Sequence, residues 1–367
     1  MAMEAVEDYT EGNISITPDY IYEDPGSFCE KSSVREFAKY FLTLIYCCVF
    51  FLGITGNGLV VLIYIHYKKM KTMTDVYLLN LAIADILFLL TLPFWAIAAS
   101  HHWVFKTATC KIVTSMYRIN FYSGMLLLAC ISVDRYIAIV QAMKAQNYKP
   151  KRFFYSKLIC LGVWLLAIAL SIPEFMYSTE TSSIVFGAGT SVKSCTMVYP
   201  SDLSQSLKVS VLILRLTMGF GIPVVVMICC YAVVIKTLLQ AKSFEKHKAL
   251  KVIFSVMAVF VLSQLPYNSI LVLQTLDAAN LTAPDCDMAK KIDIATQVTQ
   301  SMAFLHSCLN PFLYVFIGVR FRHDVLKMLK KLGCISQANW AKYIKSEWSV
   351  KRYSGILETR SSGTLSL

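Results

Sequence analysis

The stretch IVTSMYRINFYSGMLLLACISVDRYIAIV, residues 112–140, decides the fold class of this chain. Crossing the hydrocarbon core of a bilayer as a helix takes about 20 mostly apolar residues, and this stretch is long enough. Near its end stands Asp134-Arg135-Tyr136, although a charge in hydrocarbon costs roughly 2.5–3.5 kcal/mol on insertion scales. Because the adjacent acid can pair with Arg135, the triplet indicates a switch at the end of a membrane span. The alternative is a snorkelling anchor at the membrane interface.

Six further stretches share this length and character. Of all residues, 56% are hydrophobic and 16% are charged, whereas soluble domains carry about 25% charged residues. Each stretch is far longer than the roughly 10 residues of a membrane β-strand. The sequence therefore predicts an all-α membrane protein, a seven-transmembrane helix bundle. The predicted spans are residues 40–64, 76–99, 112–140, 158–177, 209–239, 252–276 and 292–317.

The basic residues set the orientation of the bundle. Lysine and arginine gather between spans one and two, three and four, and five and six, and after span seven. By the positive-inside rule these segments are cytoplasmic, which places the N-terminus outside the cell. We expect a multi-pass protein of the plasma membrane, with no cleavable signal peptide because the first 30 residues are polar. The net charge of +12 is then a charge of the inner face and does not indicate nucleic acid binding.

The extracellular N-terminal segment is acidic. Residues 1–30 contain eight acids and no Lys or Arg, so we expect this segment to be disordered and to attract basic partners. Tyr20 and Tyr22 lie among the acids, a setting in which tyrosines of secreted proteins are commonly sulfated. Asn13 and Asn280 begin glycosylation sequons on the same side. The alternative is a tail that only adds solubility.

The cytoplasmic end carries an amphipathic pattern. Apolar residues recur at helical spacing from Phe321 to Leu332, with basic residues on the other faces, which predicts a short helix on the lipids of the anionic inner leaflet. Cys334 follows it as a candidate palmitoylation site, with a free thiol as the alternative. The predicted segments are an acidic N-terminus over residues 1–37, the bundle over 38–317, the amphipathic helix over 318–333 and a Ser/Thr-rich tail over 334–367.

Polar residues inside the spans point to function, because a polar group in hydrocarbon is costly unless it is paired. Asp85 is expected to be the only acid deep in a span, and Asn120, Ser307 and Asn310 occupy comparable depths. One carboxylate with several neutral oxygens suits a small hard cation such as Na⁺, or a water network. The alternative is that the Asn and Ser side chains only form hydrogen bonds between helices.

Aromatic and polar side chains are concentrated in the outer halves of the spans. Aromatic belts are expected at both membrane faces, but Tyr117, Arg215 and Gln300 lie about a turn or more inside, where a lipid-facing Arg would be costly. The sequence therefore predicts a wet extracellular ligand pocket. Its predicted lining is Tyr46, Trp95, Tyr117, Arg215, Tyr267 and Gln300.

Cysteines and prolines add covalent links and hinges. Since the extracellular side is oxidising, four outer cysteines predict two disulfides, and their spacing leaves three connectivities open. Prolines within five spans free backbone carbonyls and predict kinks. The outer cysteines are Cys29, Cys110, Cys195 and Cys286, and the prolines are Pro93, Pro173, Pro223, Pro266 and Pro311.

One landmark in each span resembles the rhodopsin-like G-protein-coupled receptors, and the resemblance covers about residues 38–332. Within that class the chain is similar to the C-C chemokine receptors. Three features carry this similarity: Thr91-Leu92-Pro93, the segment of residues 134–140, and the Cys29 and Cys286 pair beside Cys110 and Cys195. The landmarks are Asn57, Asp85, Asp134-Arg135-Tyr136, Trp164, Pro223 with Tyr231, Pro266, and Asn310-Pro311-x-x-Tyr314.

The resemblance implies a receptor rather than an enzyme. Its ligand would be a basic C-C chemokine, and it would signal through a G protein of the Gi class to calcium mobilisation and leukocyte chemotaxis. It implies disulfides Cys110–Cys195 and Cys29–Cys286, no cofactor apart from a structural Na⁺, and a tail that receptor kinases and arrestin recognise. The switch residues it implies are Asp134, Arg135, Tyr136, Tyr231, Pro266, Asn310, Pro311 and Tyr314.

Two residues depart from the wider pattern. Gln264 stands where most rhodopsin-like receptors have a Trp, and Gln300 where many C-C chemokine receptors have a Glu that meets the chemokine's amino-terminus. Several alternatives fit the sequence less well. A light receptor would need a Lys deep in span seven, an amine receptor an acid at Tyr117, and a transporter an internal repeat. A chemokine-scavenging receptor that does not signal, or a receptor for another peptide, remains the alternative.

Overall fold

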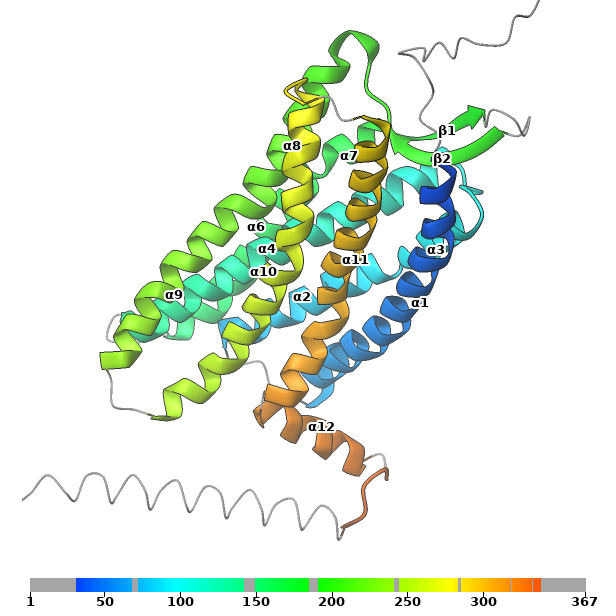
Figure 1. Cartoon of the computed structure of the whole chain (residues 1–367). Helices are drawn as coiled ribbons and strands as arrows, with labels where there is room; N and C mark the ends of the chain where they lie inside the picture. Colours follow the sequence, from blue (N-terminus) through cyan, green and yellow to red (C-terminus); the bar gives the residue numbers. More distant parts are fainter. Residues whose placement is uncertain are drawn as a thin grey trace, which may run out of the picture.

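The computed structural model describes residues 31–67, 72–141, 149–184, 191–240, 244–282, 285–317, 319–331 and 333–337. Long helices form a bundle with a two-stranded hairpin at one end and a short helix at the other (Figure 1). We call the hairpin end the outer end and the opposite end the inner end. The predictions for Asn13, Tyr20, Tyr22, Cys29 and the tail beyond residue 337 lie outside the described residues.

The described helices follow the seven predicted spans. α1 begins at Ser32, so residues 32–37, which we assigned to the N-terminal segment, are helical. Short π-helical turns follow α1 at Ile63–Tyr67 and follow α8 at Thr217–Gly221. The helices are α1 (Ser32–Leu62), α2 (Met73–Leu89), α3 (Leu92–Ser100), α4 (Thr107–Val140), α6 (Lys149–Leu170), α7 (Ile172–Tyr177), α8 (Ser204–Leu216), α9 (Ile222–Gln240), α10 (Phe244–Ala278), α11 (Cys286–Ile317) and α12 (Val319–Lys331).

Apolarity alone identifies most of these spans. Among the described residues, 6 helical stretches are long and apolar enough to cross a membrane. Helix α11 is not among these 6 stretches, because it carries polar residues such as Gln300, His306 and Asn310. Of these, His306 and Asn310 are buried, so the seventh helix depends on neighbouring helices to pair its polar groups.

The predicted prolines coincide with breaks in three spans and lie inside helices in two. Pro93 and Pro173 occupy the first turns of α3 and α7, and each follows a short interruption of its span. Pro223 is the second residue of α9, directly after the π-helical turn. Pro266 and Pro311 lie within α10 and α11, which continue through them.

The hairpin at the outer end was not predicted from the sequence. β1 (Ser178–Ile184) pairs in antiparallel fashion with β2 (Ser191–Met197). Both strands are mostly polar and lack the alternation of apolar and polar residues that marks a half-buried strand. The available signal was the pair of β-branched stretches on either side of Gly187 and Gly189, which is typical of a hairpin.

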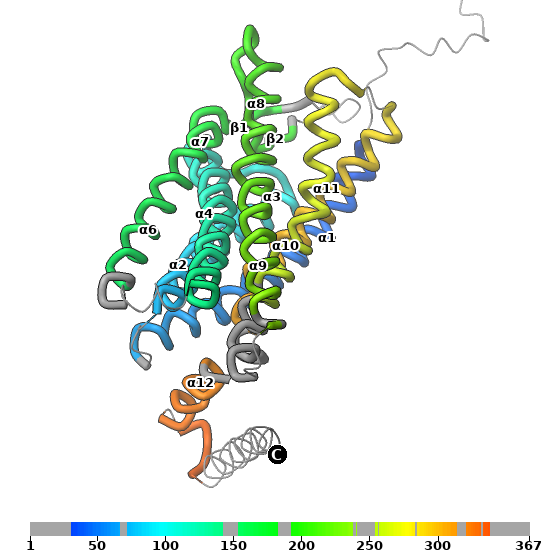
Figure 2. Tube along the Cα trace, turned by 90° about the vertical axis from the view of Figure 1, so that its left-hand side faces the viewer, coloured from blue at the N-terminus to red at the C-terminus, as the bar shows by residue number. Residues whose placement is uncertain are grey.

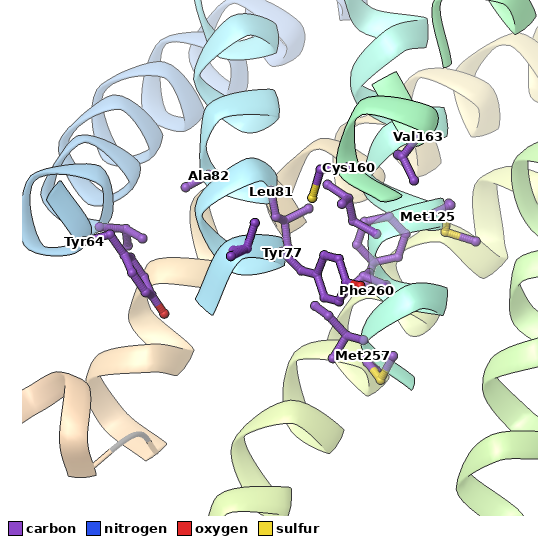
Figure 3. Close-up of a cluster of buried hydrophobic side chains, with 14 of the residues drawn as sticks. Tyr64, Tyr77, Leu81, Ala82, Met125, Cys160, Val163, Met257 and Phe260 are labelled. Carbon is purple, nitrogen blue, oxygen red and sulfur yellow. The ribbon is translucent and has the colours of Figure 1, made fainter. Parts of the chain in front are cut away.

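The apolar core of the inner half joins α2, α4, α6 and α10. Leu81, Met125 and Phe260 are almost fully buried in it, and Figure 3 shows part of this cluster. Gly219 lets the span formed by α8 and α9 approach α4, because a Cβ at this position would lie 2.3 Å from the Phe121 ring. Large apolar side chains such as Phe51 are instead exposed on the outside of the bundle, as expected for a surface that faces lipid.

The predicted amphipathic helix is present as α12 at the inner end (Figure 2). It buries Phe321 and Met328 against the bundle, next to α11 and the π-helical turn after α1. Gly333 ends it with a positive φ of 78°, and the Cys334 backbone N–H donates to the Leu329 carbonyl at 2.9 Å. This is the left-handed termination common at helix ends, and it leaves Cys334 exposed.

A disulfide joins α4 to the hairpin. Cys110 in the first turn of α4 is bonded to Cys195 of β2, with their Cα atoms 5.6 Å apart. The Trp103 backbone N–H donates to the Lys193 carbonyl at 2.9 Å, so the preceding loop is also attached to β2. Cys286 is disulfide-bonded as well, and its predicted partner Cys29 lies outside the described residues.

Replacing Cys110 by alanine should lower the stability of the purified receptor. Loss of a native disulfide costs about 2–4 kcal/mol, and here it would release the hairpin from α4. The midpoint of thermal unfolding in detergent would measure the loss. Cys48→Ala is the matched control, since Cys48 is exposed and forms no disulfide. Equal midpoints for Cys110→Ala and wild type would contradict a stabilising role.

Candidate functional site

At the inner end, Asp134 and Arg135 of α4 form the ion pair that the sequence predicts. The Arg135 Nη2 atom lies 2.6 Å from the Asp134 Oδ2 atom, and the Asp134 side chain is almost fully buried. Thr74, near the start of α2, donates its hydroxyl to Asp134 Oδ2 at 2.9 Å and accepts a hydrogen bond from Arg135. Thr74 was missed in the sequence analysis, because a threonine in a span is an ordinary helix-packing residue.

Two of the remaining switch residues, Tyr136 and Tyr231, lie close to this pair. Tyr136 packs against Val234 of α9. Tyr231 of α9 is buried, and its ring meets the ring of Phe254 of α10 edge-on, with centroids 5.9 Å apart. Tyr314 belongs to α11, but its side chain lies outside the described ones. Arg135 is therefore held toward α2 while α9 and α10 are in contact beside it.

Midway along the bundle, Asp85 of α2 is fully buried. Its Oδ1 atom accepts from Asn120 Nδ2 of α4 at 3.1 Å, and its Oδ2 atom accepts from Asn310 Nδ2 of α11 at 3.0 Å. The structure thus brings together the predicted polar residues of three spans. His306 was not predicted as a member of this cluster, and its Nε2 atom lies 3.9 Å from Asp85 Oδ1 and 3.2 Å from Ser307 Oγ.

Gln264 connects this cluster to α10. Its Nε2 atom lies 3.4 Å from the Ala303 carbonyl oxygen and 3.3 Å from His306 Nδ1. Gln264 is two residues before Pro266, so the contact joins α10 to α11 close to the proline inside α10. The Gln264 amide forms a polar contact at the position where most rhodopsin-like receptors have a Trp side chain.

Near the outer end, Glu174 of α7 binds two arginines at once. Its Oε1 atom lies 2.9 Å from Arg215 Nη2 of α8 and 3.2 Å from Arg118 Nε of α4. All three side chains are at least nine-tenths buried. Glu174 is thus a second buried acid within a predicted span, and it lies near the end of that span (158–177) rather than at mid-depth as Asp85 does. Arg118 and Glu174 were both missed, although each is a charge within an apolar stretch.

The predicted pocket residues lie around this triad. The Arg118 guanidinium lies 4.7 Å from the centroid of the Tyr117 ring. Tyr267 of α10 and Gln300 of α11 both interact with Tyr117. Tyr46 is linked to Tyr117 through Phe304. The centroid of the Phe304 ring lies 5.7 Å from the centroid of the Tyr46 ring and 5.1 Å from that of the Tyr117 ring. Five of the six predicted residues thus form one cluster, and we call it the outer cluster.

The sixth predicted residue, Trp95, lies at the border of the outer cluster. Its ring centroid is 5.7 Å from that of Trp103, which packs beside the Cys110–Cys195 disulfide. The predicted glycosylation site Asn280 is exposed in the loop between α10 and α11. Its φ of 57° is positive, a conformation that asparagine tolerates better than most residues.

Comparison with known proteins agrees with this arrangement. Residues 56–314 match the model of the 7 transmembrane receptor (rhodopsin family). The chain belongs to this family. It is 54% identical to human C-C chemokine receptor type 9 over 98% of this chain and 96% of that receptor. It is 44% identical to human C-C chemokine receptor type 7 over 99% and 93%, and 42% identical to human atypical chemokine receptor 4 over 89% of each chain.

Within the rhodopsin family the chain is therefore a chemokine receptor. Receptors of this kind are multi-pass proteins of the plasma membrane and not enzymes, as the sequence predicted. The membership gives each cluster a position in a receptor. The outer cluster faces the side from which a chemokine arrives, and the Asp134–Arg135 pair faces the side of the G protein.

Replacing Thr74 by valine should raise ligand-independent activation of the G protein. The change removes one hydrogen bond to each of Asp134 and Arg135, and a net loss of about 1 kcal/mol would shift the switch roughly fivefold toward release of Arg135. Binding of a GTP analogue to membranes without agonist would measure it. Thr55→Val on the exposed face of α1 is the control. Unchanged basal activity at equal surface expression would show that Thr74 does not restrain Arg135.

Proposed function

We propose that the chain is a signalling receptor for a basic C-C chemokine, namely the thymus-expressed C-C chemokine. It would couple through Gi to calcium mobilisation and leukocyte chemotaxis. The observation that carries the ligand assignment is the 54% identity to human C-C chemokine receptor type 9 over 98% of the chain. The pairing of Asp134 with Arg135 and Thr74 supports a signalling role, because it provides a releasable arginine at the inner end.

The first step is capture of the chemokine outside the membrane. Residues 1–30 carry eight acids and no Lys or Arg, so they would steer a basic ligand toward the outer end. Sulfation of Tyr20 or Tyr22 would strengthen that attraction. The base of this segment lies near α11, since Lys31 Nζ is 2.6 Å from Asp293 Oδ2, and Cys286 is disulfide-bonded in the first turn of the same helix.

The second step is insertion of the chemokine's amino-terminal segment into the outer cluster. Tyr267 belongs to this cluster and lies one residue beyond Pro266 of α10. Movement there would strain the contact between Gln264 and His306, and His306 lies beside Asp85. The inner part of α10 would swing outward about Pro266, with a rearrangement at Pro311–Tyr314. Release of Arg135 from Asp134 would then let its guanidinium bind the G protein.

Calcium responses of transfected cells to a panel of chemokines test this proposal. The thymus-expressed C-C chemokine should give a response that a Gi-inactivating toxin removes. Arg135→Asn should keep chemokine binding and lose the calcium response, because Arg135 is far from the ligand. Binding of the chemokine by the wild-type receptor without any G-protein response would instead favour the scavenging alternative. No binding of any chemokine would overturn the receptor assignment itself.

A sodium ion at Asp85 is a second part of the proposal. The cluster offers the Asp85 carboxylate, the Ser307 hydroxyl and the Asn310 Oδ1 atom, which has no hydrogen-bond partner among the described residues. These are oxygen ligands, with Asn120 completing the surroundings, and they fit a hard cation. An ion held there would favour the arrangement in which α2, α4 and α11 converge on Asp85.

Sodium should therefore lower agonist affinity in the wild-type receptor, because a ligand that prefers one state shifts the equilibrium toward it. Asp85→Asn removes the carboxylate and should abolish the effect. Competition binding in sodium chloride against an equal concentration of N-methylglucamine chloride would measure it at constant ionic strength. If agonist affinity in the Asp85→Asn receptor depended on sodium as it does in wild type, the ion would bind elsewhere.

A further inference from the structure

The triad of Arg118, Glu174 and Arg215 carries an uncompensated positive charge inside the outer end of the bundle. Two guanidiniums share the single oxygen Oε1 of one carboxylate, so the formal charge of the triad is positive. Among the described residues, no other carboxylate forms an ion pair with either arginine. Burying a charge without a partner is costly, and the arrangement therefore has capacity for a further anion.

The arginine side of the triad has an unused hydrogen-bond donor, as a site for a further anion requires. The Nη1 atom of Arg118 is buried and has no hydrogen-bond partner among the described residues, and the same is true of Glu174 Oε2. The guanidinium of Arg118 lies 4.7 Å from the centroid of the Tyr117 ring and is also bound by Glu174. An unpaired N–H group on a guanidinium held by such contacts is a donor suited to a carboxylate.

The other groups that face the triad, from its own helices and from neighbouring elements, are not carboxylates. They are tyrosines, including Tyr117 and Tyr122 of α4, Tyr267 of α10 and Tyr199 between β2 and α8. Burial raises the pKa of Tyr199, so its hydroxyl stays uncharged near neutral pH. Gln300, which interacts with Tyr117, is neutral as well. Among the described residues, no carboxylate other than that of Glu174 thus lies against the triad.

We propose that Arg118 and Arg215 form a subsite for an acidic group of the ligand, a carboxylate in the chemokine segment that enters the outer cluster. Glu174 holds the two guanidiniums together until that carboxylate arrives and then competes with it. This inference rests on the proposed function, because it needs a peptide segment that inserts from outside. It assigns to this receptor a positively charged binding site at the depth of Tyr117, where the amine end of a ligand would be repelled.

Three roles of the triad predict different signs when its charges are removed. If it binds a ligand carboxylate, Arg118→Gln weakens chemokine binding and Glu174→Gln strengthens it, since the competitor is gone. If it binds a ligand amine, both signs are reversed. If it only stabilises the fold, both variants lose binding and stability together. The two neutralising substitutions therefore separate the three roles.

The experiment measures binding of the thymus-expressed C-C chemokine to full-length receptors in cell membranes. We expect Arg118→Gln and Arg215→Gln to raise the Kd about tenfold or more, which is the loss of one charge-assisted hydrogen bond, and Glu174→Gln to lower it. Arg118→Lys should retain part of the affinity. Arg322→Gln on the exposed face of α12 is the matched control. Surface expression and thermal unfolding of each variant are measured in parallel.

A second arm changes the ligand and leaves the receptor intact. In this chemokine every Asp and Glu ahead of the first cysteine is replaced by the matching amide. The wild-type receptor should bind this variant about tenfold more weakly, whereas Arg118→Gln should bind both chemokines equally, as expected of two changes that remove one interaction. This arm decides the question even if a charge variant of the receptor fails to reach the cell surface.

Equal binding of both chemokines to the wild-type receptor would overturn the subsite, and so would weaker binding by Glu174→Gln at wild-type stability. In either case a receptor that still bound and responded to the chemokine would leave the proposed function intact. A receptor that bound no chemokine of the panel would overturn the proposed function, and the subsite with it.

Discussion

The absence of water from the bilayer core is the constraint on which this structure depends. A charged or polar side chain buried between the helices is costly unless it finds a partner within the protein, and buried acids form such contacts at three depths. Glu174 joins α7 to α4 and α8, Asp85 joins α2 to α4 and α11, and Asp134 joins α4 to α2. Each cluster therefore acts as a specific contact between helices whose apolar surfaces would pack in many ways.

Helix α4 contributes to all three clusters, through Arg118, Asn120 and Asp134. It is one uninterrupted helix over Thr107–Val140, and the Cys110–Cys195 disulfide fixes its outer end to the hairpin. A helix held in this way is suited to act as the stationary element against which others move. In the proposed mechanism the moving elements are α10 and α11, which contain prolines and which meet through the hydrogen bond between Gln264 and His306.

The sequence predicted the parts of the fold that the membrane imposes. Seven spans, the amphipathic α12 and the surroundings of Asp85 follow from apolar length, charge bias and the rarity of an acid in hydrocarbon. It did not reveal Thr74, Arg118 and Glu174 as partners, because their contacts join residues distant in sequence and leave no periodic pattern. Glu174 and Arg118 also lie near the ends of their spans, where a single charge is easily attributed to the interface. The polar hairpin was missed because its two strands do not alternate apolar and polar residues.

The charge of the outer cluster shows how one scaffold can serve different ligands. The fold requires that buried charges be paired, but it does not fix the sign of what is left over. Position 300 in span seven is a neutral Gln, and two arginines face one glutamate, so the net charge of the outer cluster is positive here. A glutamate at position 300 would add a negative charge beside Tyr117 and cancel it. Ligand preference in such a receptor can therefore change through one or two residues while the helix contacts that hold the bundle together stay the same.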